Sequence, residues 1–215
     1  MSPAPASAGA WVVSEGGQEI WGSAVGERDD LTFFESSAYL ELPLNDDASF
    51  VATPWAEQNY DTADGWKAEA TVGVKHAIFR DDEAAMAVQA GALWISHPSD
   101  PDCGEGGAEV RWLAGRALGE RGFVNLEVAT RALNGGCESE RADLTLGYRP
   151  SAEWLGMAQI YLDAPREDED VVRAQISLVR FWEGGNGVQF GLRTRIDGGP
   201  AEAAFVLNLW GRPGD

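Results

Sequence analysis

The feature that most constrains the fold is a two-residue alternation of apolar and polar side chains, which recurs along most of the chain. In residues 66–74 every second residue is apolar, namely Trp66, Ala68, Ala70, Val72 and Val74. Successive side chains of a strand point to opposite faces, so a period of two predicts strands with one apolar and one polar face. No helical period of useful length appears. The sequence therefore predicts an all-β protein.

Segments of this kind recur roughly every 15 residues, with turn-forming residues between them. The predicted strands are residues 18–25, 31–43, 48–57, 66–79, 84–96, 108–117, 122–132, 141–149, 153–162, 171–182, 187–196 and 201–210. Bacterial single-chain barrels have an even number of antiparallel strands, and about twelve satisfies this rule. We expect a closed, antiparallel up-and-down transmembrane β-barrel. One domain, residues 17–211, would lie between an N-terminal tail (1–16) and a C-terminal tail (212–215).

The predicted connections alternate in length. Those after the even-numbered strands are tight, as in residues 45–47, 80–83, 119–122, 150–152 and 183–186. Those after odd-numbered strands are mostly longer, as in residues 58–65, 97–107, 134–140 and 163–170. Short turns at one end and long loops at the other are typical of outer-membrane barrels, whose termini lie at the short-turn end.

The alternation alone does not separate a membrane barrel from a soluble sheet. A soluble sheet buries its apolar face in a core, whereas a membrane barrel turns that face to lipid and its polar face to the lumen. The apolar faces here are rich in Ala, Val and Leu rather than in bulky residues, and the polar faces carry opposite charges on almost every strand. Small soluble barrels instead fill their interior with apolar side chains. Both details favour the membrane barrel.

Charge excludes one class of partner. The formal net charge is −19 and only Lys67 and Lys75 are lysines, so the chain would repel phosphate backbones and we expect no nucleic-acid partner. No stretch approaches the roughly 20 apolar residues of a transmembrane helix. The mean hydropathy of −0.24 is compatible with a membrane barrel, because alternating strands average to a moderate value.

The N-terminal residues suggest a signal-peptide remnant. Ala6-Ser7-Ala8 has the small-x-small form of a signal-peptidase site, although no basic or apolar region precedes it. An ordinary tail rich in alanine and proline is the alternative.

Nine tryptophans are many for one domain. Most lie near the ends of predicted strands: Trp21, Trp55, Trp66, Trp94, Trp112, Trp154, Trp182 and Trp210. Amphipathic rings at both membrane boundaries would form the girdles of an outer-membrane barrel. Ordinary core tryptophans are the alternative.

Several short stretches carry a resemblance to a family. They are residues 9–11 and 15–18, Leu113-Ala114-Gly115-Arg116, residues 141–150 (RADLTLGYRP) and the closing Leu207-Asn208-Leu209-Trp210. Together they resemble porin-like outer-membrane barrel proteins of alphaproteobacteria, a largely uncharacterised group. The resemblance implies the fold and a location in the outer membrane of a Gram-negative bacterium, and it transfers no site residues. Such proteins typically end on an aromatic residue, whereas this chain continues past Trp210 to Asp215.

Two cysteines lie in predicted loops after the fifth and seventh strands. These loops share one end of the barrel and belong to adjacent hairpins, so a Cys103–Cys137 disulfide is geometrically reasonable and an oxidising periplasm would form it. Two unrelated free thiols are the alternative. A zinc site is not expected, because His76 and His97 lack ligand spacing.

Acidic loops are a further feature. Asp100, Asp102 and Glu105 lie in one predicted loop, and residues 167–170 (EDED) lie in another. Clustered carboxylates can hold Ca²⁺ or bridge to lipopolysaccharide through divalent cations, but no calcium-loop consensus is present. A solvated charge run is the more ordinary interpretation, and we expect no other cofactor.

The predicted lumen is charged. Candidate selectivity residues are Lys67, Glu69, Lys75, Glu109, Arg111, Glu127, Arg131, Asp143, Arg173, Gln175, Gln189, Arg193 and Arg195, and Glu35 and Glu41 also face inward. Tight pairing would plug the barrel, whereas basic residues gathered on one wall would select small anionic solutes. The last five candidates lie on adjacent strands and would form a basic stripe.

The sequence thus favours a small porin or solute channel. Its alternatives are a closed structural or adhesive outer-membrane barrel, which contacts lipid and lipopolysaccharide, and a soluble barrel that binds an apolar ligand. Hydrolytic chemistry has little support. Neither His76 nor His97 forms a recognisable motif with a serine and an acid, although His97 lies near Ser96 and Ser99. We therefore expect no enzyme.

Overall fold

A computed structural model of the chain describes residues 9–13, 16–58, 65–96, 98, 102–165, 169–182 and 185–213. These residues form twelve strands: β1 (Gln18–Arg28), β2 (Leu31–Asn45), β3 (Ala48–Gln58), β4 (Trp66–Arg80), β5 (Ala84–Ile95), β6 (Gly106–Leu118), β7 (Gly122–Leu133), β8 (Cys137–Ser151), β9 (Trp154–Pro165), β10 (Val171–Phe181), β11 (Gly187–Asp197) and β12 (Glu202–Gly211). The predicted strands are confirmed, with shifts at their ends.

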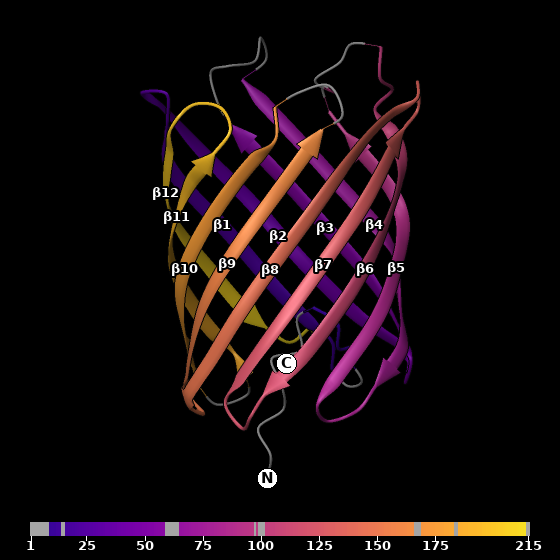
Figure 1. Ribbon diagram of the computed structural model, residues 1–215, viewed down its shortest axis with the longest axis vertical. Coiled ribbons are helices and arrows are strands. Elements are labelled where there is room, and N and C mark those ends of the chain that lie inside the picture. Colours follow the sequence, from indigo (N-terminus) through magenta and orange to yellow (C-terminus); the bar gives the residue numbers. More distant parts are fainter. Residues whose placement is uncertain are drawn as a thin grey trace.

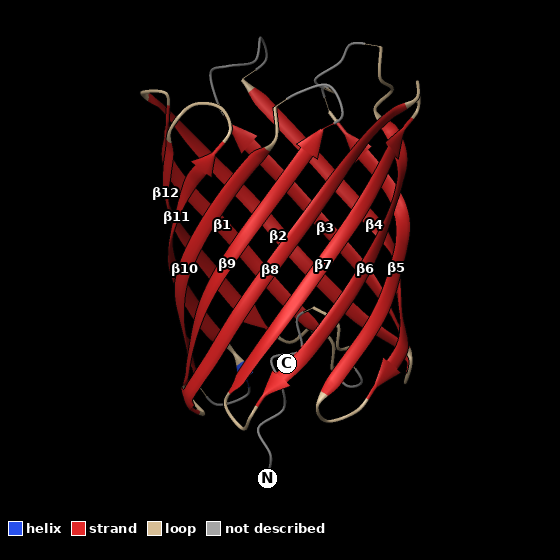
Figure 2. Cartoon of the chain, viewed as in Figure 1, coloured by secondary structure: helices blue, strands red, loops and turns tan. Residues whose placement is uncertain are grey.

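The strands close into one barrel in which each pairs with its neighbours in the sequence and β12 pairs with β1 (Figures 1 and 2). All pairings are antiparallel, as hairpin connections require. Closure leaves no free sheet edge, so every strand finds backbone partners on both sides. Among the described residues no helix is long and apolar enough to cross a membrane.

The barrel has two distinguishable ends. At the turn end, where β1 begins and β12 ends, two to five residues connect the strands (46–47, 81–83, 119–121, 152–153 and 182–186). At the loop end, the connections over residues 59–65 and 96–105 are longer, as predicted, whereas the connection expected over residues 163–170 is shortened to residues 166–170 because β9 extends to Pro165. Residues 29–30 and 134–136, in contrast, are tight turns. Asp29 and Asp30 both adopt positive φ, the conformation that two-residue hairpin turns need.

Strand β8 begins earlier than predicted. Residues 134–140 were expected to form a loop, but β8 already starts at Cys137. Glu138 and Glu140 are exposed on its outer face. A strand that projects beyond the bilayer faces water on its outside, so it has no apolar alternation by which the sequence could reveal it.

The outer face of the barrel is apolar. Large hydrophobic side chains stand exposed on strand after strand, among them Ile176 (65 % exposed), Leu192 and Leu146. Such a continuous apolar surface is what a transmembrane barrel presents to lipid. Strands of 10 to 15 residues are long enough, because a tilted strand crosses the hydrocarbon core in about 9–11 residues.

The tryptophans divide between the two faces. Trp21, Trp66, Trp94, Trp112 and Trp182 are exposed on the outside, and Trp154 lies under the guanidinium of Arg180 at the turn end. Trp55 and Trp210 instead face the lumen, which corrects their assignment to a girdle. Side chains two positions apart in a strand point to the same face. Trp55 therefore lies on the same face as Glu57, and Trp210 on the same face as Asn208, and all four line the lumen.

The interior holds polar side chains and one segment that the sequence analysis assigned to the N-terminal tail. Residues 10–13 are at most 8 % exposed, and Trp11 packs against Ala85, Ala87 and Leu113 on the inner face of β5 and β6. Part of the predicted tail therefore lies inside the barrel.

Candidate solute pathway

The lumen contains a cavity of about 580 Å³. It shares five lining residues with a second cavity of about 820 Å³ at the loop end: Trp55, Lys67, Glu69, Arg141 and Asp163. The two together form a vestibule that leads from the loop end into the barrel. Phe123, Met157 and Trp210 line the part of the inner cavity nearest the turns, and Gly9 contributes to its wall.

Four arginines gather around one carboxylate on one wall of the vestibule. Glu202 of β12 has a fully buried side chain and pairs with Arg28 (2.9 Å), Arg173 (3.2 Å), Arg193 (3.3 Å) and Arg195 (3.1 Å). Arg28 also pairs with Glu57, and Arg193 with Glu35. We call these four arginines and Glu35, Glu57 and Glu202 the arginine wall.

The strand register explains why Glu202 is needed. Arg173 and Arg195 are direct partners across β10 and β11, so their like charges face each other on the inner surface. Like charges directly opposite one another destabilise a sheet. A buried carboxylate that bonds to both guanidiniums offsets this repulsion, and Glu202 occupies that place.

The opposing wall shows the converse arrangement. Glu127 and Asp143 are direct partners across β7 and β8, and Arg111 lies within 2.8 Å and 3.8 Å of their carboxylates. Arg131 joins Glu69 to Glu109, and Arg141 joins Glu69 to Asp163. This acidic wall holds three arginines and five carboxylates: Arg111, Arg131, Arg141, Glu69, Glu109, Glu127, Asp143 and Asp163.

A belt of amides lies below the arginine wall. Gln175 donates to Gln159 at 3.1 Å, and Gln189 donates to Ser177 at 3.0 Å. The side-chain oxygen of Gln189 accepts from Asn208 and from the Trp210 indole. These neutral groups are held in place by one another, so the belt offers a polar but uncharged lining.

The turn-end half of the lumen is organised around one buried ion pair. Lys75 Nζ lies 2.7 Å from Glu41 Oε2, and both side chains are 0 % exposed. Lys75 also donates to the backbone oxygens of Gly9 and Trp11 at 3.0 and 3.1 Å. Glu41 accepts from the Val13 N–H and from Ser49. Burying two charges is tolerated only when they are paired and fully hydrogen-bonded, and these contacts satisfy both.

Apolar side chains form a second buried group at the turn end. Leu155, Met157, Val179 and Trp210 form a buried cluster, against which Ile20, Phe123 and Phe181 pack. The Phe181 ring meets the Trp210 ring edge-on at 5.7 Å.

The structure places all thirteen predicted lumen residues on the inner face. Arg173, Arg193 and Arg195 belong to the arginine wall, Gln175 and Gln189 to the amide belt, and Lys75 to the turn-end pair. Lys67 lines both cavities opposite Glu57 in the register. The remaining six, Glu69, Glu109, Arg111, Glu127, Arg131 and Asp143, lie on the acidic wall.

The predicted basic stripe is not a row of unpaired arginines, because Glu202 neutralises part of its charge. Sequence reasoning missed Glu57, Glu202, Arg28, Arg141 and Asp163. The alternation of β12 placed Ala203 outward and so already implied that Glu202 faces inward. Arg28 was missed because the first strand was ended at residue 25, three residues too early.

The acidic residues and histidines that were weighed as metal ligands or catalytic groups are only partly described. Asp102, Glu105, Glu169 and Asp170 are described, whereas Asp100, Glu167 and Asp168 lie outside the described residues. The described residues include no group of three or more potential metal ligands. His76 is exposed on the outer face, because its neighbour Lys75 points inward, and His97 is outside the described residues.

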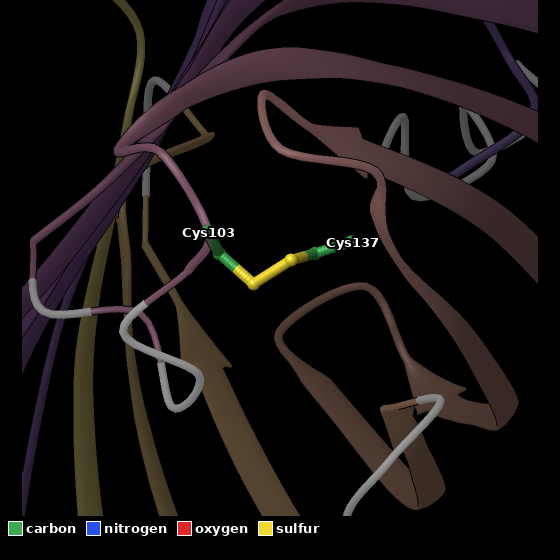
Figure 3. Close-up of a disulfide and its surroundings, with 2 residues drawn as sticks. All are labelled: Cys103 and Cys137. Carbon is green, nitrogen blue, oxygen red and sulfur yellow. A yellow bond between two sulfur atoms is a disulfide. The ribbon is translucent and has the colours of Figure 1, made fainter.

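The disulfide is confirmed. Cys103 and Cys137 are bonded with their Cα atoms 5.8 Å apart, joining the 96–105 loop to the start of β8 (Figure 3). Two backbone bonds hold the same loop: Gly104 N–H donates to Asn134 O, and Asn134 N–H donates to Gly106 O. The loop that carries part of the vestibule wall is therefore tied down at the barrel rim.

We expect both thiols to be unreactive in the folded protein. A maleimide reagent should label neither cysteine before reduction and both afterwards, because the two sulfurs are bonded to each other and no free cysteine exists. Mass spectrometry of the alkylated protein measures this. Stoichiometric labelling without reductant would contradict the bridge.

Comparison with known proteins supports the architecture. No protein-family model matches the chain, and no curated protein matches it in sequence. Among solved structures, the COG4313 outer membrane channel from Pseudomonas putida F1 has a TM-score of 0.64 at 12 % identity and covers 96 % of this chain and 98 % of its own. The NanC porin has a TM-score of 0.62 at 10 % identity (88 % and 98 %), and the KdgM porin 0.60 at 6 % (89 % and 98 %). The chain has the fold of outer-membrane porins.

Proposed function

We propose that the protein is a passive channel for small solutes in the outer membrane of a Gram-negative bacterium, with a preference for anions. The observation that carries the proposal is the vestibule, a charged cavity that enters a barrel whose outside is apolar. A cavity with charged walls would be filled by water and ions rather than by an apolar ligand. The outer-membrane channels with the same fold support the assignment.

The arginine wall is the basis for the anion preference. Its four arginines outnumber its three carboxylates, and guanidinium groups bind carboxylates and phosphates through paired hydrogen bonds. The acidic wall opposite carries the larger excess, with five carboxylates to three arginines, so the proposed preference rests on a solute path along the arginine wall and not on the net charge of the lumen. A solute that bears a negative group would therefore pass with that group toward the arginine wall. The KdgM porin has been solved in complex with disordered oligogalacturonate, a ligand that fits this chemistry.

Changing Glu202 to glutamine should shift ion selectivity toward anions. The variant removes the carboxylate shared by four arginines, and so raises the positive charge facing the vestibule. Arg193→Gln removes a positive charge from the same wall and should shift ion selectivity toward cations. The reversal potential in a KCl gradient across a planar bilayer measures both. Asp47→Asn, the same kind of change outside the barrel interior, is the control. Equal reversal potentials in all four proteins would contradict the proposed role of the arginine wall.

A closed structural or adhesive barrel is the second candidate. The observation that favours it is the filling of the turn end by the Lys75–Glu41 pair, residues 9–13 and the Trp210 cluster. In that case the acidic loops would contact lipopolysaccharide, with Ca²⁺ as a bridging ion. A folded barrel that never conducts, even after residues 2–13 are removed, would favour this function over a channel.

A further inference from the structure

We propose that residues 9–13 are a plug, bound in a site built for them, that narrows the turn-end half of the lumen and holds the channel in a low-conductance state. This inference rests on the proposed channel function. A channel does not require a plug, since a charged vestibule could also lead through an open turn end to the far side of the membrane.

The first support is that the barrel binds the backbone of this segment. Lys75 donates to the Gly9 and Trp11 carbonyl oxygens, while Glu41 accepts from the Val13 N–H. One charged pair thus satisfies three backbone groups of a segment that belongs to no strand. Backbone groups buried without partners are costly, so the pair makes burial of the segment possible.

The second support is a space that fits Trp11. The indole packs in the pocket between Ala85, Ala87 and Leu113, three inner-face residues of β5 and β6. A Cβ atom at Gly115 would lie 2.3 Å from the Trp11 ring and 2.4 Å from the Asn125 side-chain oxygen, so glycine at this position leaves room for the indole and for the amide beside it. Ala85, Ala87 and Gly115 are small inner-face residues beside the segment, whereas Glu109 and Arg111, farther along β6 toward the loop end, are charged.

The third support is the place of the segment on the solute path. Gly9 lines the vestibule beside Asn125, and its φ of 91° is one that glycine adopts readily. From there the segment runs to Val13, whose N–H donates to Glu41 of the turn-end ion pair. Removing residues 9–13 would vacate the space beside the inner face of β4–β6.

Planar-bilayer conductance of the full chain and of four variants tests the plug. The full chain should show small conductance steps, and a variant lacking residues 2–13 should show steps several-fold larger. Gly115→Ala should also raise the conductance of the full chain, because the new methyl group displaces the indole. In the background lacking residues 2–13, Gly115→Ala should have little effect. Trp21→Gly, which removes an exposed tryptophan from the outer face, is the control and should behave like the full chain.

Equal conductance in the full chain and the shortened variant would overturn the plug and leave the channel function intact. If all variants fold but carry no current, the proposed channel function is wrong, and chemical labelling then tests whether residues 9–13 occupy the lumen. Ala10→Cys should resist a water-soluble maleimide in the full chain and become reactive with Gly115→Ala, whereas Ala201→Cys on the exposed rim should react in both. Reaction of Ala10→Cys as fast as Ala201→Cys would show that the segment does not occupy the lumen.

Discussion

Replacing Lys75 by methionine is expected to lower the free energy of unfolding by about 3–5 kcal/mol, the usual cost of leaving one member of a buried ion pair without its partner. Glu41 would remain 0 % exposed with an uncompensated charge, and the Gly9 and Trp11 carbonyl oxygens would lose their donor. Denaturant titration of the barrel refolded in lipid vesicles, followed by tryptophan fluorescence, gives the value.

The double variant Lys75→Met/Glu41→Leu separates the burial of charge from the loss of packing. It should recover the part of the lost stability that comes from the uncompensated charge, because a buried pair replaced by apolar residues of similar volume is often neutral or stabilising. The part that comes from the backbone groups of Gly9, Trp11 and Val13 should stay lost, since neither new side chain can bond to them. Arg80→Met is the matched control, since Arg80 pairs with Asp47 at 3.5 Å on an exposed surface, where ion pairs contribute little. If Lys75→Met and Arg80→Met cost the same, the buried pair does not organise the turn end.

Introducing arginine at Ile176 should destabilise the barrel in lipid by about 2–4 kcal/mol, the cost of a charge near the bilayer midplane. Ile176 is 65 % exposed and is the central residue of β10, so it lies midway between the turn end and the loop end of that strand. In a soluble protein, arginine at an exposed position of this kind would change stability by roughly 0.5 kcal/mol at most.

Ile196→Arg provides the depth control for that experiment. Ile196 is 58 % exposed on the same face but lies beside the last residue of β11, at the loop end. A charge near the interface costs only about 0–1 kcal/mol. Vesicle-based unfolding should therefore rank Ile176→Arg as the more damaging change. Equal and small effects would indicate that water, and not lipid, surrounds this face.

Most of the barrel could be predicted because the pattern that specifies each strand lies within that strand and the turns beside it. The period of two identifies which side chains point inward within one strand, and turn residues mark where strands end. Lys67, Glu69 and Arg193 were placed in the lumen on this basis alone, as the structure has them. The disulfide followed from the same logic, since adjacent hairpins bring Cys103 and Cys137 to one rim.

The arrangement of the charges could not be predicted, because it depends on contacts across the barrel. Arg141 meets Glu69, which is 72 residues earlier in the chain, and Arg193 meets Glu35, 158 residues away. Alternation gives the face of each side chain but not its height relative to strands that are not its neighbours. The pairing of four arginines with Glu202 therefore emerged only from the closed structure.

Residues 9–13 escaped prediction for a different reason. Ala10-Trp11-Val12-Val13 is a short apolar run between a tail rich in alanine and proline and the pair Gly16-Gly17, with neither alternation nor a helical period. Its place in the lumen depends on Lys75, Glu41 and Gly115, which come from three different strands. A sequence pattern records none of these partners.

The most direct test of the central claim, that a charged and water-filled lumen crosses the membrane, is the planar-bilayer conductance of the protein lacking residues 2–13. Heat-modifiable gel mobility would first establish that the barrel is folded. We expect discrete, stable conductance steps whose reversal potential in a salt gradient responds to Glu202→Gln. A folded barrel that inserts into the bilayer and carries no current would contradict it.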